Sequence, residues 1–534
     1  QLSGSWWFPA LLIGTGIFFT IYLGFPQFRF FGQGWRIVTG KHGGEGSKGE
    51  TTPFEALTTA MSGAVGTGNI GGVALAIWTG GPAAIFWMWI TAIFGMTTKF
   101  VEVTLAHKFR TTLSDGSISG GPMYYIEKGL NMKWVAILFS ALMMICAIGS
   151  GNMPQINNIA NVMETEFSVP KLMTGLVLGG LLWIIIIGGI TRIAAVASKI
   201  IPIMGVIYFG GALIVLINNY ENIIPSFNAI FSQVFTGSAA VGGFLGASFA
   251  MSLKYGVARG LYSNEAGQGS SPIAHASSKT EKSIEQGMVS ILEPFIDTIV
   301  VCSVTAMVIL SSGVWTEKFE NSFDRTSMTV ISGVYSDANE DDVIELSKYV
   351  QNMPSEITNF NGVISLEAGS IVSSNATIIH KRSVGEDVII SRDGNLVTGD
   401  LEITNGSFVE RGLNIRGKSL IDSAELTAKA FSQSSMNEYG GYLVAIALLL
   451  FAFSTAIAWC YYGDRSTAYI FGEKGVFWYR NFYVLCFILA AVIDTEVVWN
   501  IAYVVVALVS IPNLIAIFVL RREMKDDVDN YKLN

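Results

Sequence analysis

The 534-residue sequence has few charged side chains: Asp, Glu, Lys and Arg make up 14% of it, whereas soluble domains carry about 25%. It also has only 13 prolines, 4 cysteines and 4 histidines. The shortage of charge excludes an ordinary cytosolic enzyme, a nucleic-acid-binding protein and a disordered chain. The cysteines lie in apolar runs and the histidines are scattered, so we expect neither a disulfide framework nor a zinc site.

Apolar residues and glycine are abundant instead, at 51% of the chain and 57 residues respectively. A helix needs about 20 apolar residues to cross a bilayer, and we find about eleven candidate stretches in residues 1–313 and 438–534. These two segments are predicted to be the first and second parts of a membrane core. The sequence thus predicts an all-α membrane protein of about eleven spans, surrounded by membrane lipids.

Residues 314–437 interrupt this pattern. They contain 18 acidic and 10 basic residues, so the whole formal charge of −8 lies in this segment. Short stretches such as Gly362–Leu366 and Asp387–Ser391 alternate apolar and polar residues, a pattern typical of strands. We predict a small β-rich soluble insert, with one helix near residues 339–350. Whether it binds an outside partner or another copy of itself is open.

The positions of the basic residues predict the orientation of the spans. Arg29, Lys108 and Arg521 follow the first, third and last candidate spans. Positively charged loops stay in the cytoplasm, so we expect the N-terminus and the insert outside and the C-terminus in the cytoplasm. The expected location is the plasma (inner) membrane.

The second candidate span contains an unusual segment, residues 62–72, with five glycines beside Thr67 and Asn69. An unwound segment in lipid offers carbonyl groups to a cation, and the half-helix after it offers N–H groups to a carboxylate. The alternative is a glycine-rich packing surface, and Thr67 and Asn69 favour a site. Residues 241–251 form a second interruption, five spans later, as in an inverted-repeat transporter.

Other polar side chains lie within the spans. Ser454 and Thr455 are oxygen ligands suited to Na⁺, although each hydroxyl can instead bond its own helix one turn back. Gln155 lies near the outer end of the fourth span. Glu293 and Asp297 either couple H⁺ movement or pair with Lys254 or Arg259.

Several motifs resemble those of the alanine/glycine:cation symporter family. They are Gly66-Thr-Gly-Asn-Ile70, Gly80-Gly-Pro82, Gly120-Gly-Pro-Met-Tyr124, Gly256-Val-Ala-Arg-Gly260 and Ser263-Asn-Glu-Ala-Gly267. The resemblance covers the chain outside the insert. It implies a LeuT-like 5+5 inverted repeat with one extra N-terminal helix, and Na⁺-coupled uptake of alanine or glycine by alternating access.

The resemblance also implies roles for individual residues. The Na⁺ ligands would be the carbonyls of Ser62, Val65 and Phe451 and the side chains of Ser454 and Thr455. The substrate-binding residues would be Thr67, Gly68, Asn69, Gln155, Phe249, Leu253, Thr455 and Trp459. The bulk of Trp459 implies a small substrate side chain.

Transport needs no covalent chemistry, so we expect no organic cofactor and no catalytic residue. Na⁺ would be the co-transported ion. H⁺-coupled amino-acid transport, and a receptor or channel that uses the insert, are the alternatives.

Overall fold

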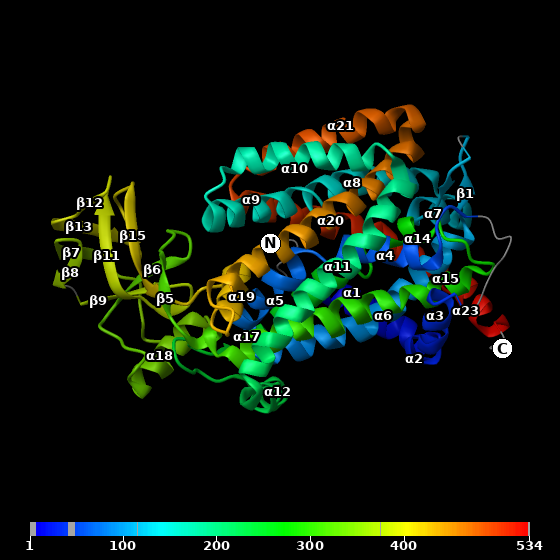
Figure 1. The fold of residues 1–534 in the computed structure, drawn as a ribbon. Coiled ribbons are helices and arrows are strands. Elements are labelled where there is room, and N and C mark those ends of the chain that lie inside the picture. The colour runs from blue at the N-terminus through cyan, green and yellow to red at the C-terminus, as the bar shows by residue number, and fades with distance from the viewer. Residues whose placement is uncertain (1–6, 41–48, 115, 374, 532–534) are drawn as a thin grey trace.

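The computed structural model describes residues 7–40, 49–114, 116–373 and 375–531. It consists of a bundle of long helices with a β-rich body at one end (Figure 1). The first half of the bundle contains α1 (Trp7–Tyr22), α2 (Pro26–Arg29), α3 (Phe31–Val38), α4 (Pro53–Ala64), η1 (Gly68–Gly72), α5 (Val73–Gly80), α6 (Ala83–Lys108), α7 (Pro122–Leu130), α8 (Lys133–Gly149), α9 (Met153–Phe167), α10 (Lys171–Ile186), α11 (Gly189–Asn218), η2 (Tyr220–Asn222) and α12 (Ile223–Ser232).

The chain then returns through a second set of helices. They are α13 (Phe249–Asn264), α14 (Ser271–His275), α15 (Ser283–Ser290), α16 (Leu292–Pro294), η3 (Phe295–Cys302), α17 (Ser303–Ser312), η4 (Val314–Thr316), α19 (Ser423–Ser432), α20 (Glu438–Phe471), α21 (Glu473–Ala490), α22 (Thr495–Val519) and α23 (Arg521–Asn530). Two short strand pairs accompany the bundle: β1 (Thr111–Thr112) with β2 (Ile118–Ser119), and β3 (Gly237–Ser238) with β4 (Ala247–Ser248).

The expected fold class, an all-α protein with a LeuT-like 5+5 inverted repeat and about eleven spans, is wrong. Among the described residues, six helices are long and apolar enough to cross a membrane, or seven if the bent pair Pro53–Ala64 and Gly68–Gly80 counts as one span. The chain also contains an eight-stranded sheet, so the β-rich part is not small.

The sequence predicts too many membrane spans because some apolar helices are too short and others contain charged residues. Helices α1 and α10 have 16 residues each, so each is about 24 Å long at 1.5 Å per residue, short of a hydrocarbon core of about 30 Å. Two more candidates are interrupted by charge: α13 carries Lys254 and Arg259, and the 18-residue α21 carries Glu473, Lys474 and Arg480. Apolar composition alone did not reveal these limits.

The β-rich body contains two sheets and α18 (Glu340–Val350). The eight-stranded sheet has the order β14-β13-β7-β8-β11-β15-β5, with β12 paired to β11, and the second has the order β10-β9-β6. The strands are β5 (Phe319–Ser322), β6 (Met328–Ser332), β7 (Gly362–Glu367), β8 (Ser370–Ser373), β9 (Ala376–His380), β10 (Ser383–Val384), β11 (Glu386–Arg392), β12 (Asn395–Leu396), β13 (Gly399–Thr404), β14 (Ser407–Phe408) and β15 (Leu413–Ser419). Among the described residues, the strand pairs of both sheets are antiparallel.

The β-rich body contacts the bundle through a few specific groups. The indole of Trp78, in the last turns of α5, donates a 2.9 Å hydrogen bond to the carbonyl of Lys381. Phe244, from the β3–β4 loop, packs with Leu420 beyond β15. The strands therefore lie at the end of the bundle where α5 ends and α13 begins (Figure 1).

Candidate functional site

The glycine-rich segment of the second span is a break between two helices. Thr52 and Glu55 form a capping box that starts α4, and the helix ends at Ala64. A π-helical turn, η1, follows at Gly68, and the axes on either side differ by 57°. Gly66 permits a close approach here, because a Cβ atom at this position would lie 2.6 Å from Oγ1 of Thr455. The break thus faces α20 directly.

A small cavity of about 310 Å³ lies at this break. Its lining includes five residues that the sequence predicts for the substrate: Thr67, Gly68, Gln155, Thr455 and Trp459. It also includes residues that the sequence reasoning did not assign: Gly63, Ala64, Gly66, Ser150, Tyr262, Glu265 and Gln268. The cavity therefore lies between the break, the junction of α8 and α9, the end of α13, and α20.

Unsatisfied polar groups face this region. The hydroxyl of Thr67 is buried and has no hydrogen-bond partner among the described residues. The amide N–H of Thr67 lies 3.5 Å from Oε1 of Gln155, at the limit of a hydrogen bond. A buried hydroxyl without a partner costs about 1–3 kcal/mol, so this group is suited to a ligand that accepts or donates a hydrogen bond.

Four of the predicted cation ligands meet beside the cavity. Oγ1 of Thr455 lies 3.0 Å from the carbonyl oxygen of Phe451 and 3.4 Å from that of Val65. Ser454 donates a 2.9 Å hydrogen bond to the same Phe451 carbonyl. Both hydroxyls thus bond their own helix, as the alternative interpretation expects, and Thr455 also reaches across to the break. The hydroxyl of Ser62 bonds Thr59 within α4.

Asn69 connects the break to η3 by hydrogen bonds and does not line the cavity. Its Nδ2 donates to Oδ1 of Asp297 at 2.6 Å and to Oγ of Ser263 at 3.2 Å, while its Oδ1 accepts from the amide of Gly66 at 2.9 Å. Oδ2 of Asp297 also accepts from Ser263 at 2.7 Å. Asn69 and Asp297 are therefore the centre of a buried polar cluster that holds the break in place.

Phe249 and Leu253 lie outside the cavity. They are in the first turns of α13, where the ring of Phe249 packs on Trp87 with centroids 6.0 Å apart. The cavity is lined instead by Tyr262 near the other end of α13, and by Glu265 and Gln268 beyond it. Substrate contact by Phe249 and Leu253 stays a prediction from resemblance.

Glu265 is the functional candidate that sequence reasoning missed. It directly follows α13 in the left-handed region, with φ of 56°, and it is buried. Its Oε1 accepts a 3.0 Å hydrogen bond from the indole of Trp459, and its Oε2 accepts a 2.7 Å hydrogen bond from Ser270. An acidic residue in the glycine-rich stretch that follows the seventh candidate span was the available signal.

A second charged group lies deeper in the bundle. Lys99 of α6 pairs with Glu293 at 2.8 Å, both side chains being fully buried, and also donates to Ser271 at 2.7 Å. Nε2 of His275 lies 3.4 Å from the other oxygen of Glu293. The suggested pairing of Glu293 or Asp297 with Lys254 or Arg259 is therefore not what the structure shows.

Comparisons with known proteins identify the family and relatives of this chain. A family model described as the sodium:alanine symporter family matches residues 1–339 and 403–534. An uncharacterized transporter of Haemophilus influenzae is 33% identical, over all of this chain and 96% of its own length. The sodium/alanine symporter AgcS of Methanococcus maripaludis is 35% identical, over 96% of this chain and 91% of its own. The amino-acid carrier protein AlsT of Bacillus subtilis is 41% identical over 56% of this chain and 63% of its own.

The long apolar helices and these similarities define a multi-pass membrane transporter, not an enzyme. The chain belongs to the sodium:alanine symporter family, whose function is Na⁺-coupled amino-acid symport. The resemblance and the function predicted from the sequence are thereby confirmed. The family model does not match residues 340–402, which contain α18 and most of the strands of the β-rich body.

Proposed function

We propose that this protein imports small neutral amino acids, alanine and glycine, together with Na⁺ by alternating access. The observation that carries the proposal is the cavity at the break of the second span. It brings a free hydroxyl, that of Thr67, and a carboxylate, that of Glu265, to the lining of one small space. An amino acid has a carboxylate, an ammonium group and, in alanine, one methyl group.

The two charged ends of the substrate have different partners in this proposal. Its carboxylate binds at Thr67 and Gly68, where the half-helix begins and its N–H groups carry partial positive charge. Its ammonium group binds the carboxylate of Glu265. Gln155 and Trp459 limit the space left for a side chain, and the indole of Trp459 is held by Glu265 and by the Gly63 carbonyl at 3.3 Å.

Na⁺ binds between the break and α20. Its ligands are the carbonyl oxygens of Ser62, Val65 and Phe451 and the hydroxyls of Ser454 and Thr455. Support comes from the short separations of Thr455 Oγ1 from the carbonyls of Val65 and Phe451. A cation here would join the broken span to α20, and its entry supplies about 2.3 kcal/mol per charge for each 100 mV of membrane potential.

The proposed orientation places the N-terminus and the insert, residues 314–437, outside the cell. Lys108 donates a hydrogen bond to Glu523 of α23, and Lys282 lies over the ring of Tyr531. Figure 1 shows α23 at the end of the bundle away from the strands. Positively charged ends face the cytoplasm. The substrate would then enter from the side that carries the β-rich body.

The test is uptake of labelled alanine into proteoliposomes with an imposed Na⁺ gradient. We expect accumulation with the gradient and none when K⁺ replaces Na⁺ on both sides. Thr455→Val should raise the Na⁺ concentration for half-maximal uptake at least about tenfold, since one charge-assisted ligand contributes about 1.5–3 kcal/mol, and Thr455→Ser should restore it. Equal uptake with and without Na⁺, or uptake driven by a pH gradient alone, would refute Na⁺ coupling.

A further inference from the structure

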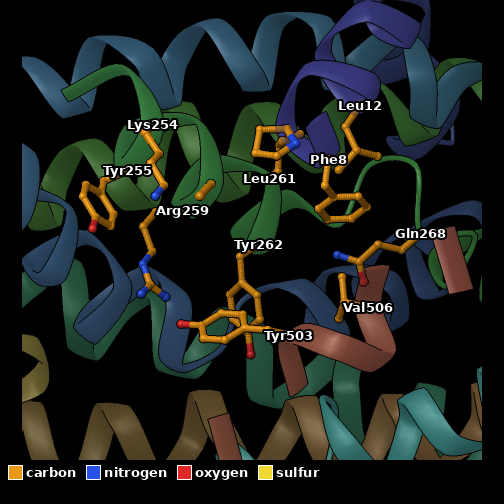
Figure 2. A pocket seen from close by; sticks show the side chains of 12 residues that line it. Phe8, Leu12, Lys254, Tyr255, Arg259, Leu261, Tyr262, Gln268, Tyr503 and Val506 are labelled. Carbon is orange, nitrogen blue, oxygen red and sulfur yellow. The ribbon is translucent and has the colours of Figure 1, made fainter. Parts of the chain in front are cut away.

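A second and larger cavity, of about 930 Å³, lies between α1, α13 and α22. Its two ends differ in chemistry, as Figure 2 shows: Lys254, Tyr255 and Arg259 lie at one end, and Phe8, Leu12 and Leu261 at the other. Tyr262 and Gln268 line both this cavity and the smaller one at the break. We name it the α1–α13–α22 pocket.

The cationic end is not neutralised by the protein. Within the described ranges, neither Lys254 nor Arg259 forms an ion pair; their charged groups lie over the rings of Tyr255 and Tyr503, at 5.5 and 5.7 Å from the ring centres. Two buried carboxylates of the bundle have other partners, Glu293 being paired with Lys99 and Asp297 with Asn69. A charged side chain between membrane helices costs free energy unless it is paired or hydrated. This end of the pocket is therefore suited to an anion.

The other end of the pocket is apolar and suited to a hydrocarbon chain. Phe8, Leu12 and Val506 present only carbon atoms there, and the pocket is larger than the cavity at the break. Alanine would leave most of it empty. Next to Phe8 and Leu12 on α1, Trp7 and Leu11 are exposed, so the pocket borders an exposed apolar face of the bundle.

We infer that the α1–α13–α22 pocket binds a phospholipid with an anionic headgroup. Its phosphate lies between the ammonium group of Lys254 and the guanidinium of Arg259, and one acyl chain lies along Phe8, Leu12 and Val506. Arg is well suited to phosphate because its planar fork donates two parallel hydrogen bonds. The single negative charge of the bound phosphate is shared by both cations beside Tyr262, which forms part of the wall of the cavity at the break.

The experiment is native mass spectrometry of the full-length protein in detergent with phosphatidylglycerol or phosphatidylcholine of the same chain length. We expect at least fivefold higher occupancy by phosphatidylglycerol. The double variant K254Q/R259Q should lose this preference, and K254R/R259K should keep it. The matched control R192Q/K199Q removes two exposed cations from α11 and should leave the preference unchanged. Thermal unfolding shows that each variant is folded.

The same measurement separates the other possible occupants. Glycerol phosphate that competes as strongly as phosphatidylglycerol would show a site for free phosphate and overturn the acyl-chain contact. Alanine that displaces the lipid would make the pocket part of the substrate path and overturn the proposal. Equal binding of the two lipids, or a K254Q/R259Q variant with unchanged preference, would overturn it too. None of these results depends on alanine uptake, so failure here leaves the transport proposal standing.

Discussion

The left-handed backbone at Glu265 is a costly conformation for a residue with a side chain. Residues other than glycine seldom adopt a φ near 56°, and such positions cost of the order of 1–3 kcal/mol and cluster at functional sites. Here the conformation ends α13 and directs a carboxylate to the cavity, where Trp459 and Ser270 fix both its oxygens. The arrangement fits a group that binds a cationic ligand.

Glu265→Gln should therefore weaken substrate binding without unfolding the protein. The amide keeps the size of the side chain and can still accept from Trp459, but it lacks the charge that pairs with an ammonium group. We expect the KM for alanine to rise at least about tenfold, since hydrogen bonds to charged groups contribute about 1.5–3 kcal/mol. Glu425→Gln, in α19 and outside the cavity, is the control. An unchanged KM in the E265Q variant would remove Glu265 from the binding site.

Thr67 and Asn69 are two residues apart and have different surroundings, so their variants should behave differently. Thr67→Val replaces a hydroxyl without a partner; it should raise the KM for alanine and leave the unfolding temperature nearly unchanged. Asn69→Ala removes hydrogen bonds to Gly66, Ser263 and Asp297 and leaves buried groups unpaired, at about 1–3 kcal/mol each. It should lower the unfolding temperature by several degrees. The reverse pattern in uptake and thermal unfolding would contradict these assignments.

At the scale of elements, the contact between α6 and α13 depends on glycine. A Cβ atom at Gly256 would lie 2.3 Å from the carbonyl oxygen of Ala84, and one at Gly260 would lie 2.0 Å from Oγ1 of Thr91. The two helices therefore approach more closely than side chains permit, as is common between membrane helices. This contact fixes the position of the end of α13, and with it Tyr262 and Glu265.

Gly256→Leu should separate α6 from α13. Overpacking costs typically about 1–3 kcal/mol, so we expect a lower unfolding temperature and reduced alanine uptake together. Gly210→Leu in α11 is the matched control, because no atom lies within 4 Å of a Cβ at that position; it should behave as the wild type. Equal losses in both variants would show a general intolerance of leucine.

In the β-rich body, His380 of β9 supplies a pH-dependent contribution to stability. Burial, with a smaller effect of Lys381, lowers its pKa from 6.5 to about 3, and its ring stacks on Phe323 between Ser419 and Ser327. Below pH 6.5 the unfolded chain takes up a proton that the folded chain does not, so the stabilisation is complete above this pH and is lost as the pH falls toward 3.

We therefore expect amide hydrogen exchange in β6 and β9 to accelerate between pH 7 and pH 4.5, after correction for the intrinsic rate. His380→Gln, which does not titrate, should show a much smaller change over the same interval. The spans of the same sample serve as an internal reference. If the strands keep the same protection at both pH values in the wild type, His380 does not control their stability.

The sequence allowed prediction of local features better than of distant contacts. Five glycines in residues 62–72 indicate a weak helix, and the break lies there; alternation at Gly362–Leu366 marks a stretch that forms β7. The role of Glu265 depends on Trp459, 194 positions away, which no local pattern reveals. Phe249 and Leu253 were assigned to the pocket by resemblance, yet Phe249 lies 13 residues, about 20 Å along a helix, from Tyr262.

At the scale of the whole molecule, the net charge is concentrated at one end. The entire net charge of −8 belongs to residues 314–437, and the rest of the chain is neutral overall. At the far end of the bundle, Lys108 pairs with Glu523 and Asp527 of α23, and Arg110 donates to the carbonyls of Ala276 and Ser278. The strands and α23 therefore lie at opposite ends of the bundle (Figure 1), and the proposed orientation places them on opposite sides of the membrane.

This separation makes the orientation testable with two single cysteines. Asp393→Cys places a thiol on the exposed turn between β11 and β12, and Asp526→Cys places one on the exposed face of α23. In intact cells, a membrane-impermeant maleimide should label the first variant and should label the second only after permeabilisation. The native cysteines give little background, since Cys146, Cys302 and Cys460 are buried and Cys486 is half-buried. The opposite labelling pattern would invert the proposed orientation, and the substrate would then enter from the basic end.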